Sequence, residues 1–152
     1  MAGVDVNGNG VRDDLEPLLL RHFGKTPQLL RAVANSVIAI QAAMAATNDQ
    51  ESARAHSMAI RAGECFAAAD GHFEGDDQKV LEVLTLQMNT PQREAAVQAH
   101  MVRIAGQNFF VRNAPKWDAS CLVRADLIAN DPPGQPPGNS RQAPATHVRE
   151  LK

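Results

Sequence analysis

The stretch Asp5-Val6-Asn7-Gly8-Asn9-Gly10-Val11-Arg12-Asp13-Asp14-Leu15-Glu16 organises this chain. Oxygen-bearing side chains recur at its first, third, fifth, ninth and twelfth positions, and a glycine occupies the sixth. A hard cation such as Ca2+ takes about six to eight oxygen ligands from such a loop, and the glycine permits the sharp turn. The spacing therefore predicts a calcium site that continues directly into a helix.

The expected ligands are five side chains and one main-chain carbonyl, that of Val11 at the seventh position. The complete predicted set is Asp5, Asn7, Asn9, Val11, Asp13 and Glu16, with Glu16 as the bidentate carboxylate. Because two of these ligands are neutral amides, we expect binding weak enough to suit calcium-rich periplasmic or extracellular fluid. The alternative is an Asn- and Gly-rich turn that caps the helix without any metal.

The loop resembles an EF-hand, with two departures. Arg12 occupies the eighth position, where an apolar residue usually pairs with a sister loop, and residues 1–4 leave no room for an entering helix. In this the loop is similar to those of dockerins and other exported bacterial calcium proteins. An unpaired loop has no partner helix to open, so we expect the ion to hold the N-terminal segment against the helices rather than to act as a sensor.

Composition and periodicity predict an all-α fold. At 152 residues, 44% of them hydrophobic, the chain can form one domain with a core, and much of its apolar content is alanine, a strong helix former. The net charge of −2, with acids and bases interspersed, argues against a nucleic-acid-binding or charged membrane-binding surface. No apolar run approaches the roughly 18 residues that a transmembrane helix needs.

We expect a bundle of about five helices within residues 1–129. Thr26-Pro27 and Thr90-Pro91 each provide a cap residue followed by a proline at the first helical position, and Asn48-Asp49 provides a turn and a cap. The predicted helices span about 13–23, 26–47, 50–70, 77–88 and 91–110. The predicted inward faces are Leu30, Val33, Val37, Ile40 and Met44; Ala55, Met58, Ala59, Ala62, Cys65, Phe66 and Ala69; Val80, Leu81, Leu84 and Met88; and Val97, Met101, Ile104 and Ala105.

Residues 113–152, the last quarter of the chain, differ in composition from the predicted bundle. Residues 113–129 are expected to cross the bundle, with a short helix from Ser120 to Ala129 and with Trp117 over an open end of the core. Residues 130–152 contain Pro-Pro-Gly repeats, which favour an extended or disordered tail.

The two cysteines, Cys65 and Cys121, allow two interpretations. In a reducing compartment they would be buried thiols, whereas beside a weak calcium loop a disulfide is favoured. Such a bridge would close a loop of some 56 residues and stabilise the fold by about 4 kcal/mol through chain entropy.

These pieces together resemble a family of small exported helical proteins of proteobacteria. The shared pattern is an Asp-x-Asn-Gly-Asn-Gly-x-Arg-Asp-Asp-x-Glu loop after a signal or lipoprotein segment, then one cysteine, a helix start around Asn-Thr and a late cysteine. Here the pattern falls on Asp5–Glu16, Cys65, Met88–Arg93, Gly106-Gln107 and Cys121, while Pro91 and the Pro-rich tail depart from it. The resemblance implies export, with or without a lipid anchor, as well as the loop and the bridge. It implies no particular activity.

For function, the sequence favours a non-catalytic periplasmic or cell-surface protein that binds another protein, such as an inhibitor or immunity protein for a toxic effector enzyme. The five histidines lie on different predicted elements, so no catalytic constellation can be read from the sequence. The alternatives are an envelope hydrolase whose site only the fold assembles, and a dockerin-like assembly module, although dockerins need two such loops. The acidic connector at residues 70–77 and the tail are the expected contact surfaces.

Overall fold

The computed structural model describes residues 3–69, 77–113 and 116–121, and it confirms an all-α bundle. These residues contain no β-strand. Residues 70–76 of the predicted connector, the part of the predicted Ser120–Ala129 helix that follows Cys121, and the tail at residues 130–152 lie outside the described residues. The elements are α1 (Glu16–Phe23), α2 (Pro27–Ala45), α3 (Asp49–Ala68), α4 (Asp77–Gln87), α5 (Pro91–Ile104) and a 3-10 turn, η2 (Asp118–Ser120).

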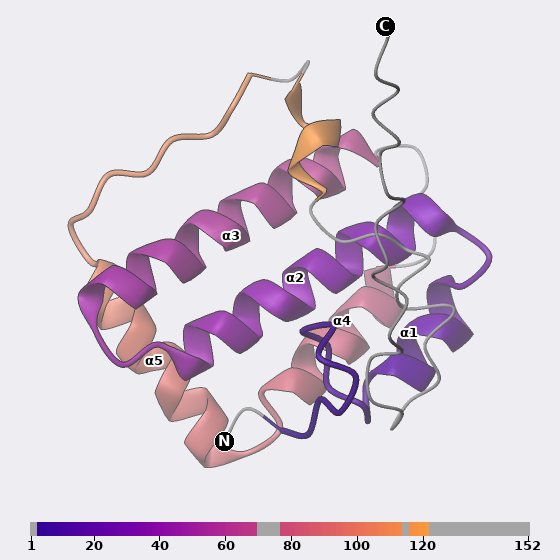
Figure 1. The fold of residues 1–152 in the computed structure, drawn as a ribbon, viewed down its shortest axis with the longest axis horizontal. Helices are drawn as coiled ribbons and strands as arrows, with labels where there is room; N and C mark the ends of the chain where they lie inside the picture. The colour runs from indigo at the N-terminus through magenta and orange to yellow at the C-terminus, as the bar shows by residue number, and fades with distance from the viewer. Residues whose placement is uncertain (1–2, 70–76, 114–115, 122–152) are drawn as a thin grey trace, which may run out of the picture.

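Helix α2 is the centre of the bundle, because it packs against α1, α3, α4 and α5 (Figure 1). It runs side by side with α3, and the two form the largest helix–helix contact. The main apolar core lies where α2 meets α1, and its fully buried members include Leu19, Phe23, Leu29, Val33 and Val37. The predicted inward stripe of α2 is thus confirmed at Val33 and Val37.

Among the described helices, α2 alone has the length and composition of a membrane-crossing segment. Within the bundle, 56% of its apolar window is buried. The core helix of a bundle has these same properties, so they do not identify α2 as a membrane segment.

Two of the predicted helix caps form as expected. The Asn48 side chain accepts a hydrogen bond from the Glu51 backbone N–H at 2.9 Å, and Thr90 does the same for Arg93 at 3.3 Å. Thr26 makes no such side-chain bond, so the start of α2 is set by Pro27, whose fixed φ suits a first helical turn.

Helix α5 ends at Ile104, so the prediction that it reaches Phe110 is wrong. Gly106 has a φ of +77°, which breaks the helical path at a residue that tolerates this conformation. The buried face of α5 is the line through His100 and Ile104, whereas Met101 is 53% exposed and Ala105 is exposed. Residues 105–113, which we call the strap, instead run along the outside of α3 (Figure 1).

The buried face of α4 also differs from the prediction. Val83 and Gln87 are fully buried, while Leu81 and Met88 are 58% and 38% exposed. The reason is a tertiary hydrogen bond, because the Gln87 side-chain amide donates to the Val37 carbonyl at 2.8 Å and turns that face of α4 toward α2. On α3 one predicted inward residue, Ala59, is exposed.

Candidate metal centre

The N-terminal loop folds around the carboxylate of Asp5. Its Oδ1 accepts from the Gly8 N–H at 2.8 Å, and its Oδ2 accepts from the Gly10 N–H at 2.9 Å. Gly8 and Gly10 have φ values of +69° and +86°, a conformation in which other residues are strained. The prediction that the sharp turn needs a glycine at position six is therefore confirmed at Gly10, and Gly8 adopts the same kind of conformation.

Asn7 and Asn9 connect this turn to the start of α1. Their Oδ1 atoms accept from the backbone N–H groups of Asn9 and Val11, at 3.1 and 2.8 Å. Their Nδ2 groups both donate to Oε1 of Glu16, at 2.9 and 2.5 Å. The structure therefore gathers both predicted amide ligands at the predicted bidentate carboxylate.

Glu16 is the most informative residue of the loop. Its side chain is 0% exposed, and its Oε2 has no hydrogen-bond partner in the described structure. A buried carboxylate oxygen without a donor or a cation is costly, so such an atom requires an explanation. Because an amide carries both a donor and an acceptor end, Asn7 and Asn9 can equally offer carbonyl oxygens to a cation beside Glu16. The residues present thus fit an oxygen-liganded ion.

The other two predicted ligands have different contacts. The Val11 side chain is fully buried in the core, which fixes the backbone that carries its carbonyl. Asp13 faces the opposite arm of the loop, where its Oδ1 accepts from the Val6 N–H at 3.1 Å and its own N–H donates to the Val4 carbonyl at 2.9 Å. The described contacts therefore do not join Asp13 to Glu16.

The site depends on oxygen donors of mixed type. Within the described ranges, no three or more His, Cys, Asp and Glu side chains are grouped so that they could hold a metal. A site here would use two amides and a main-chain carbonyl in addition to carboxylates, a donor set typical of calcium rather than of zinc.

Arg12 holds the loop against the bundle, a role that its position in the motif does not predict. It is only 3% exposed, and its guanidinium donates to both carboxylate oxygens of Asp14 and, at 3.5 Å, to the Gln87 carbonyl at the end of α4. On the other side, a Cβ added at Gly10 would lie 3.2 Å from the Ile38 side chain of α2. The loop is thus packed against both α2 and α4.

A second polar cluster lies near the C-terminal end of α3, beside the disulfide. The predicted Cys65–Cys121 bridge is present and joins α3 to the segment after η2, with a Cα–Cα distance of 4.9 Å. Next to it, the buried Glu64 carboxylate accepts from the Arg112 N–H at 2.5 Å, from Arg112 Nε at 2.9 Å and from the Ser120 hydroxyl. Sequence reasoning missed this cluster, and the only signal for it was a Glu next to a buried cysteine.

The electrostatics of Glu64 follow from these contacts. Burial by itself would raise the pKa of the Glu64 carboxyl, but the hydrogen bonds from Ser120 and Arg112, together with the Arg112 charge, outweigh it and lower that pKa below its usual value. Ser120 is 0% exposed and also accepts from Arg112 Nη2, so its hydroxyl serves as a structural link.

A histidine pair lies between α3 and α5. The ring centroids of His56 and His100 are 5.9 Å apart, and Phe109 of the strap lies 4.3 Å from His56. Burial, followed by the charges of His56 and Arg103, lowers the pKa of His100, which favours a neutral ring. Nδ1 of His100 has no partner in the described residues.

The fold and its sites define an all-α, disulfide-containing bundle with an oxygen-rich N-terminal loop. No protein family, curated protein or solved structure matches the chain in comparison. Its function is therefore argued from its own geometry.

Proposed function

We propose that this chain is a non-catalytic calcium-binding protein of the periplasm or cell surface that binds another protein. One observation carries the calcium part: in the fully buried Glu16 carboxylate, Oε1 accepts from Asn7 and Asn9, while Oε2 has no hydrogen-bond partner among the described residues. When bound, Ca2+ would supply the positive charge that this buried group lacks. The ion would be held by Asp5, Asn7, Asn9, Val11, Asp13 and Glu16.

The ion has a structural role in this proposal. The loop contacts α2 at Ile38 and α4 through the bond from Arg12 to the Gln87 carbonyl. An ion that orders the loop therefore also stabilises the packing of α4 on the bundle. The disulfide supports export, because such bonds persist mainly in oxidising compartments.

The protein-binding part is supported by the strap. Phe110 and Val111 are 89% and 64% exposed, although the two ends of this segment are firmly held by α5 and by the Glu64 cluster. A rigid helical bundle that presents apolar side chains to solvent suits a binding module. An inhibitor or immunity protein for a toxic effector enzyme is the specific form of this function that we propose.

Calcium titration by calorimetry tests the metal site. We expect a Kd of about 0.1 to 1 mM, as in extracellular calcium modules, so about 10 mM Ca2+ should stabilise the fold by roughly 1.4 to 2.7 kcal/mol relative to protein with chelator. Glu16→Gln removes the bidentate anion and should abolish both the heat and the stabilisation. Glu94→Gln, an exposed carboxylate on α5, is the matched control and should behave like the wild type.

Two results would contradict the assignment: wild-type affinity in folded Glu16→Gln protein, or no binding by the wild type at about 10 mM Ca2+. Far-UV circular dichroism of both variants would establish that they are folded. The protein-binding part is tested by affinity capture from the envelope fraction, with calcium and with chelator, followed by purification of any stoichiometric partner and direct measurement of its affinity. If no protein binds directly to this chain, either with calcium or with chelator, the protein-binding part of the proposal is overturned.

A further inference from the structure

The strap is an extended segment whose central backbone makes no hydrogen bond within the part of the chain that the structure describes. It begins with a bond from the Gln107 N–H to the Ile104 carbonyl and ends with the bond from the Arg112 N–H to Glu64. Between these points, the structure shows no hydrogen bond from the backbone of Asn108–Val111 to any described residue. Four consecutive peptide groups thus remain available, as they do along the free edge of a sheet.

The strap is nevertheless held in place at three positions. At one end it continues from α5, and in the middle Phe109 packs on His56. At the other end Glu64 holds Arg112, and the Trp117 indole donates to the Arg112 carbonyl at 2.7 Å. A segment held in an extended conformation in advance loses little conformational entropy when a partner binds.

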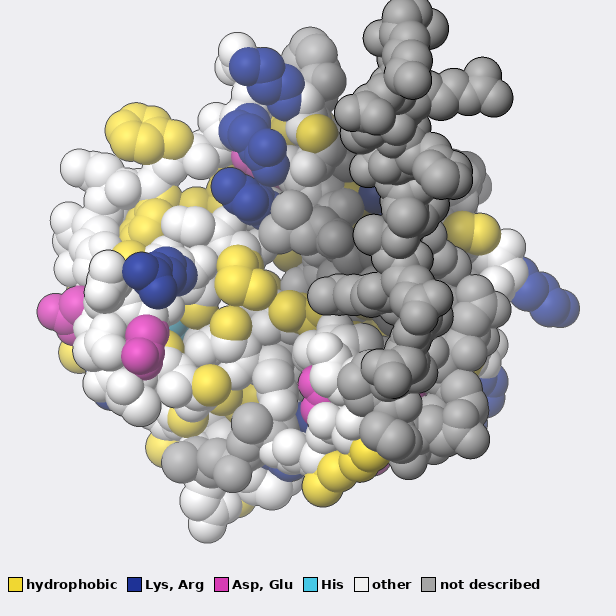
Figure 2. Space-filling view, viewed as in Figure 1, with side chains coloured by type: hydrophobic (Ala, Val, Ile, Leu, Met, Phe, Trp, Pro, Cys, Tyr) yellow, Lys and Arg dark blue, Asp and Glu magenta, His cyan; other side chains and the backbone are white. Residues whose placement is uncertain are grey.

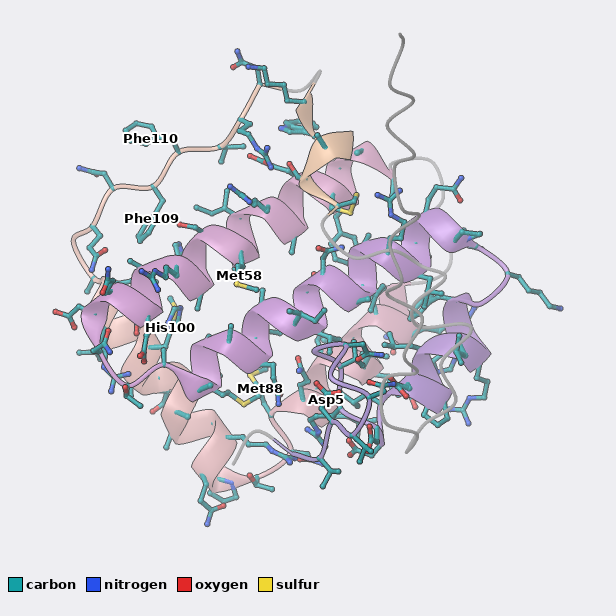
Figure 3. All side chains as sticks on the ribbon, in the orientation of Figure 1. Asp5, Met58, Met88, His100, Phe109 and Phe110 are labelled. Atoms are coloured by element: carbon teal, nitrogen blue, oxygen red, sulfur yellow. A yellow bond between two sulfur atoms is a disulfide. The ribbon has the colours of Figure 1, made fainter. Side chains whose placement is uncertain are left out.

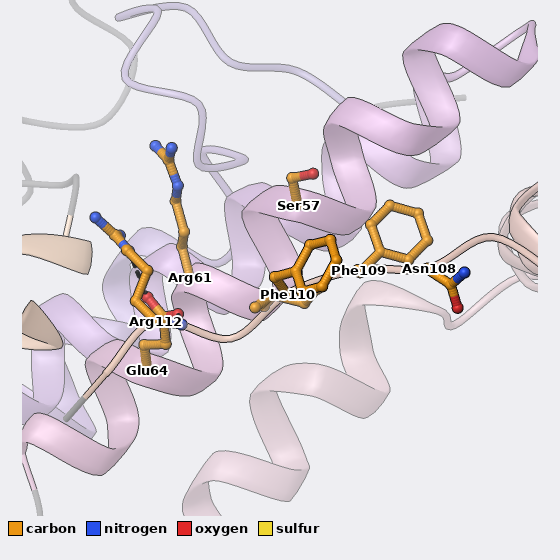
Figure 4. Close-up of a pocket in the computed structure, with 8 residues that line it drawn as sticks. Ser57, Arg61, Glu64, Asn108, Phe109, Phe110 and Arg112 are labelled. Carbon is orange, nitrogen blue, oxygen red and sulfur yellow. Dashed lines mark hydrogen bonds and ion pairs between the residues drawn. The ribbon is translucent and has the colours of Figure 1, made fainter.

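Within the strap, Phe109 and Arg112 are partly buried, whereas the consecutive residues Phe110 and Val111 are both exposed. Phe109 points toward α3, whereas Phe110 projects away from the protein (Figure 3). Between the strap and α3 lies a hollow of about 330 Å³. The residues around it that bear on recognition are Ser57, Ile60, Arg61, Phe109, Phe110 and Arg112 (Figure 4).

The charge at this hollow is positive. Arg61 and Arg112 extend in the same direction beside it (Figure 4), and Lys and Arg side chains gather on this face of the molecule (Figure 2). Arg112 is neutralised by Glu64, but Arg61 forms no ion pair with a described residue. An arginine without a counter-charge beside exposed apolar groups is complementary to a carboxylate flanked by apolar side chains.

We propose that the strap is the docking edge for an extended, acidic peptide segment of the protein partner. The segment would pair its backbone with Asn108–Val111, place an apolar side chain against Phe110 at the hollow and direct a carboxylate to Arg61. This inference rests on the proposed protein-binding function, and it specifies the surface and the chemistry of the partner.

The test uses the full chain labelled with 15N and titrated with two short peptides. One alternates Val with Asp and Glu, and the other alternates Val with Lys. We expect the acidic peptide to shift the backbone amides of residues 108–112, with an affinity that falls as salt is added, and the basic peptide to leave them unchanged.

Matched variants locate the binding. Arg61→Glu should weaken binding of the acidic peptide at least tenfold, and Phe110→Ala should weaken it severalfold. Arg21→Glu and Val102→Ala are the controls, since they change an exposed arginine on α1 and an exposed apolar residue on α5, and both should bind like the wild type.

The proposal is overturned if both peptides bind alike, if the shifts map elsewhere, or if Arg61→Glu binds normally. It is also overturned if the strap amides shift with protein concentration alone and sedimentation shows a dimer, because the occupant is then a second copy of this chain. The two hypotheses are distinguishable with the purified partner. If that partner binds wild type and Arg61→Glu equally, the docking edge is wrong while the protein-binding function stands.

Discussion

Reduction of the Cys65–Cys121 bridge gives the most quantitative prediction. The two cysteines are 56 residues apart, and the loop that their bond closes contains α4, α5 and the strap. Removing this constraint lets the unfolded chain expand, and loop-closure entropy for about 56 residues corresponds to a loss of roughly 4 kcal/mol on reduction. Since small domains have a total stability of about 5 to 15 kcal/mol, this is a large fraction.

Urea unfolding of the oxidised and the fully reduced protein measures this loss. Besides the lower free energy of unfolding, we expect a larger m-value for the reduced protein, because its unfolded state exposes more surface. Thiol titration confirms that two thiols are free. The Cys65→Ala/Cys121→Ala variant is the control. Its free energy of unfolding should agree with that of the reduced protein to within about 1 kcal/mol, a margin that allows for the packing lost at buried Cys65. Added reductant should not change the stability of this variant.

A loss below about 1 kcal/mol with an unchanged m-value would refute this reasoning. It would mean that the unfolded chain is already compact between the two cysteines, so that the bond removes little freedom from it.

Three further predictions concern single residues. Glu64→Gln should cost about 2 to 3 kcal/mol at pH 7, since it removes the charge to which Arg112 and Ser120 donate. Because the pKa of Glu64 is lowered in the folded state, the wild type should lose this stabilisation as pH falls below about 4.5. Urea unfolding at several pH values measures the free energy of unfolding, and the variant should not show this decrease. The pKa of His100 is also lowered in the folded state, so the unfolded state binds a proton first as the pH falls. The stability of the wild type should therefore decrease as pH drops below about 6.5. In the same assay, His100→Gln should make the free energy of unfolding depend less on pH in this range. Gly8→Ala should lower the free energy of unfolding by about 1 kcal/mol, because alanine is strained at the positive φ of this residue. Gly10→Ala should lower it further, since its Cβ would also meet Ile38 of α2. Thermal unfolding of both variants measures the difference, and equal losses of stability would contradict the packing of the loop on α2.

Local chemistry explains which features could be predicted. The turn at Asp5 is made by backbone groups within five positions of it, so the spacing of oxygens and glycines was sufficient to anticipate it. The caps at Asn48 and Thr90 are equally local. The gathering of Asn7 and Asn9 at Glu16 also follows from the motif, whereas the binding of calcium there stays a prediction.

Where a prediction failed, a contact between residues far apart in the sequence determined the structure. Apolar periodicity favoured Leu81 and Met88 as the inner face of α4, but the bond from Gln87 to the Val37 carbonyl, 50 residues away, rotates that face outward. Helical propensity up to Phe110 predicted a longer α5. Glu64 instead holds Arg112, 48 residues away, in an extended segment that runs along the outside of α3 (Figure 1).

By itself, the sequence determined the helical class, the loop that opens the chain and the residues that could bridge or bind an ion, because each depends on near neighbours or on residue type. Only the tertiary structure decided that Arg12 anchors the loop to α4, that Glu64 and the disulfide hold the strap, and that Phe110 faces solvent. These outcomes depend on which buried polar groups meet across long sequence separations, since a buried charge or carbonyl must find a partner wherever the packing provides one. Periodicity, which describes one segment at a time, contains no information about that choice.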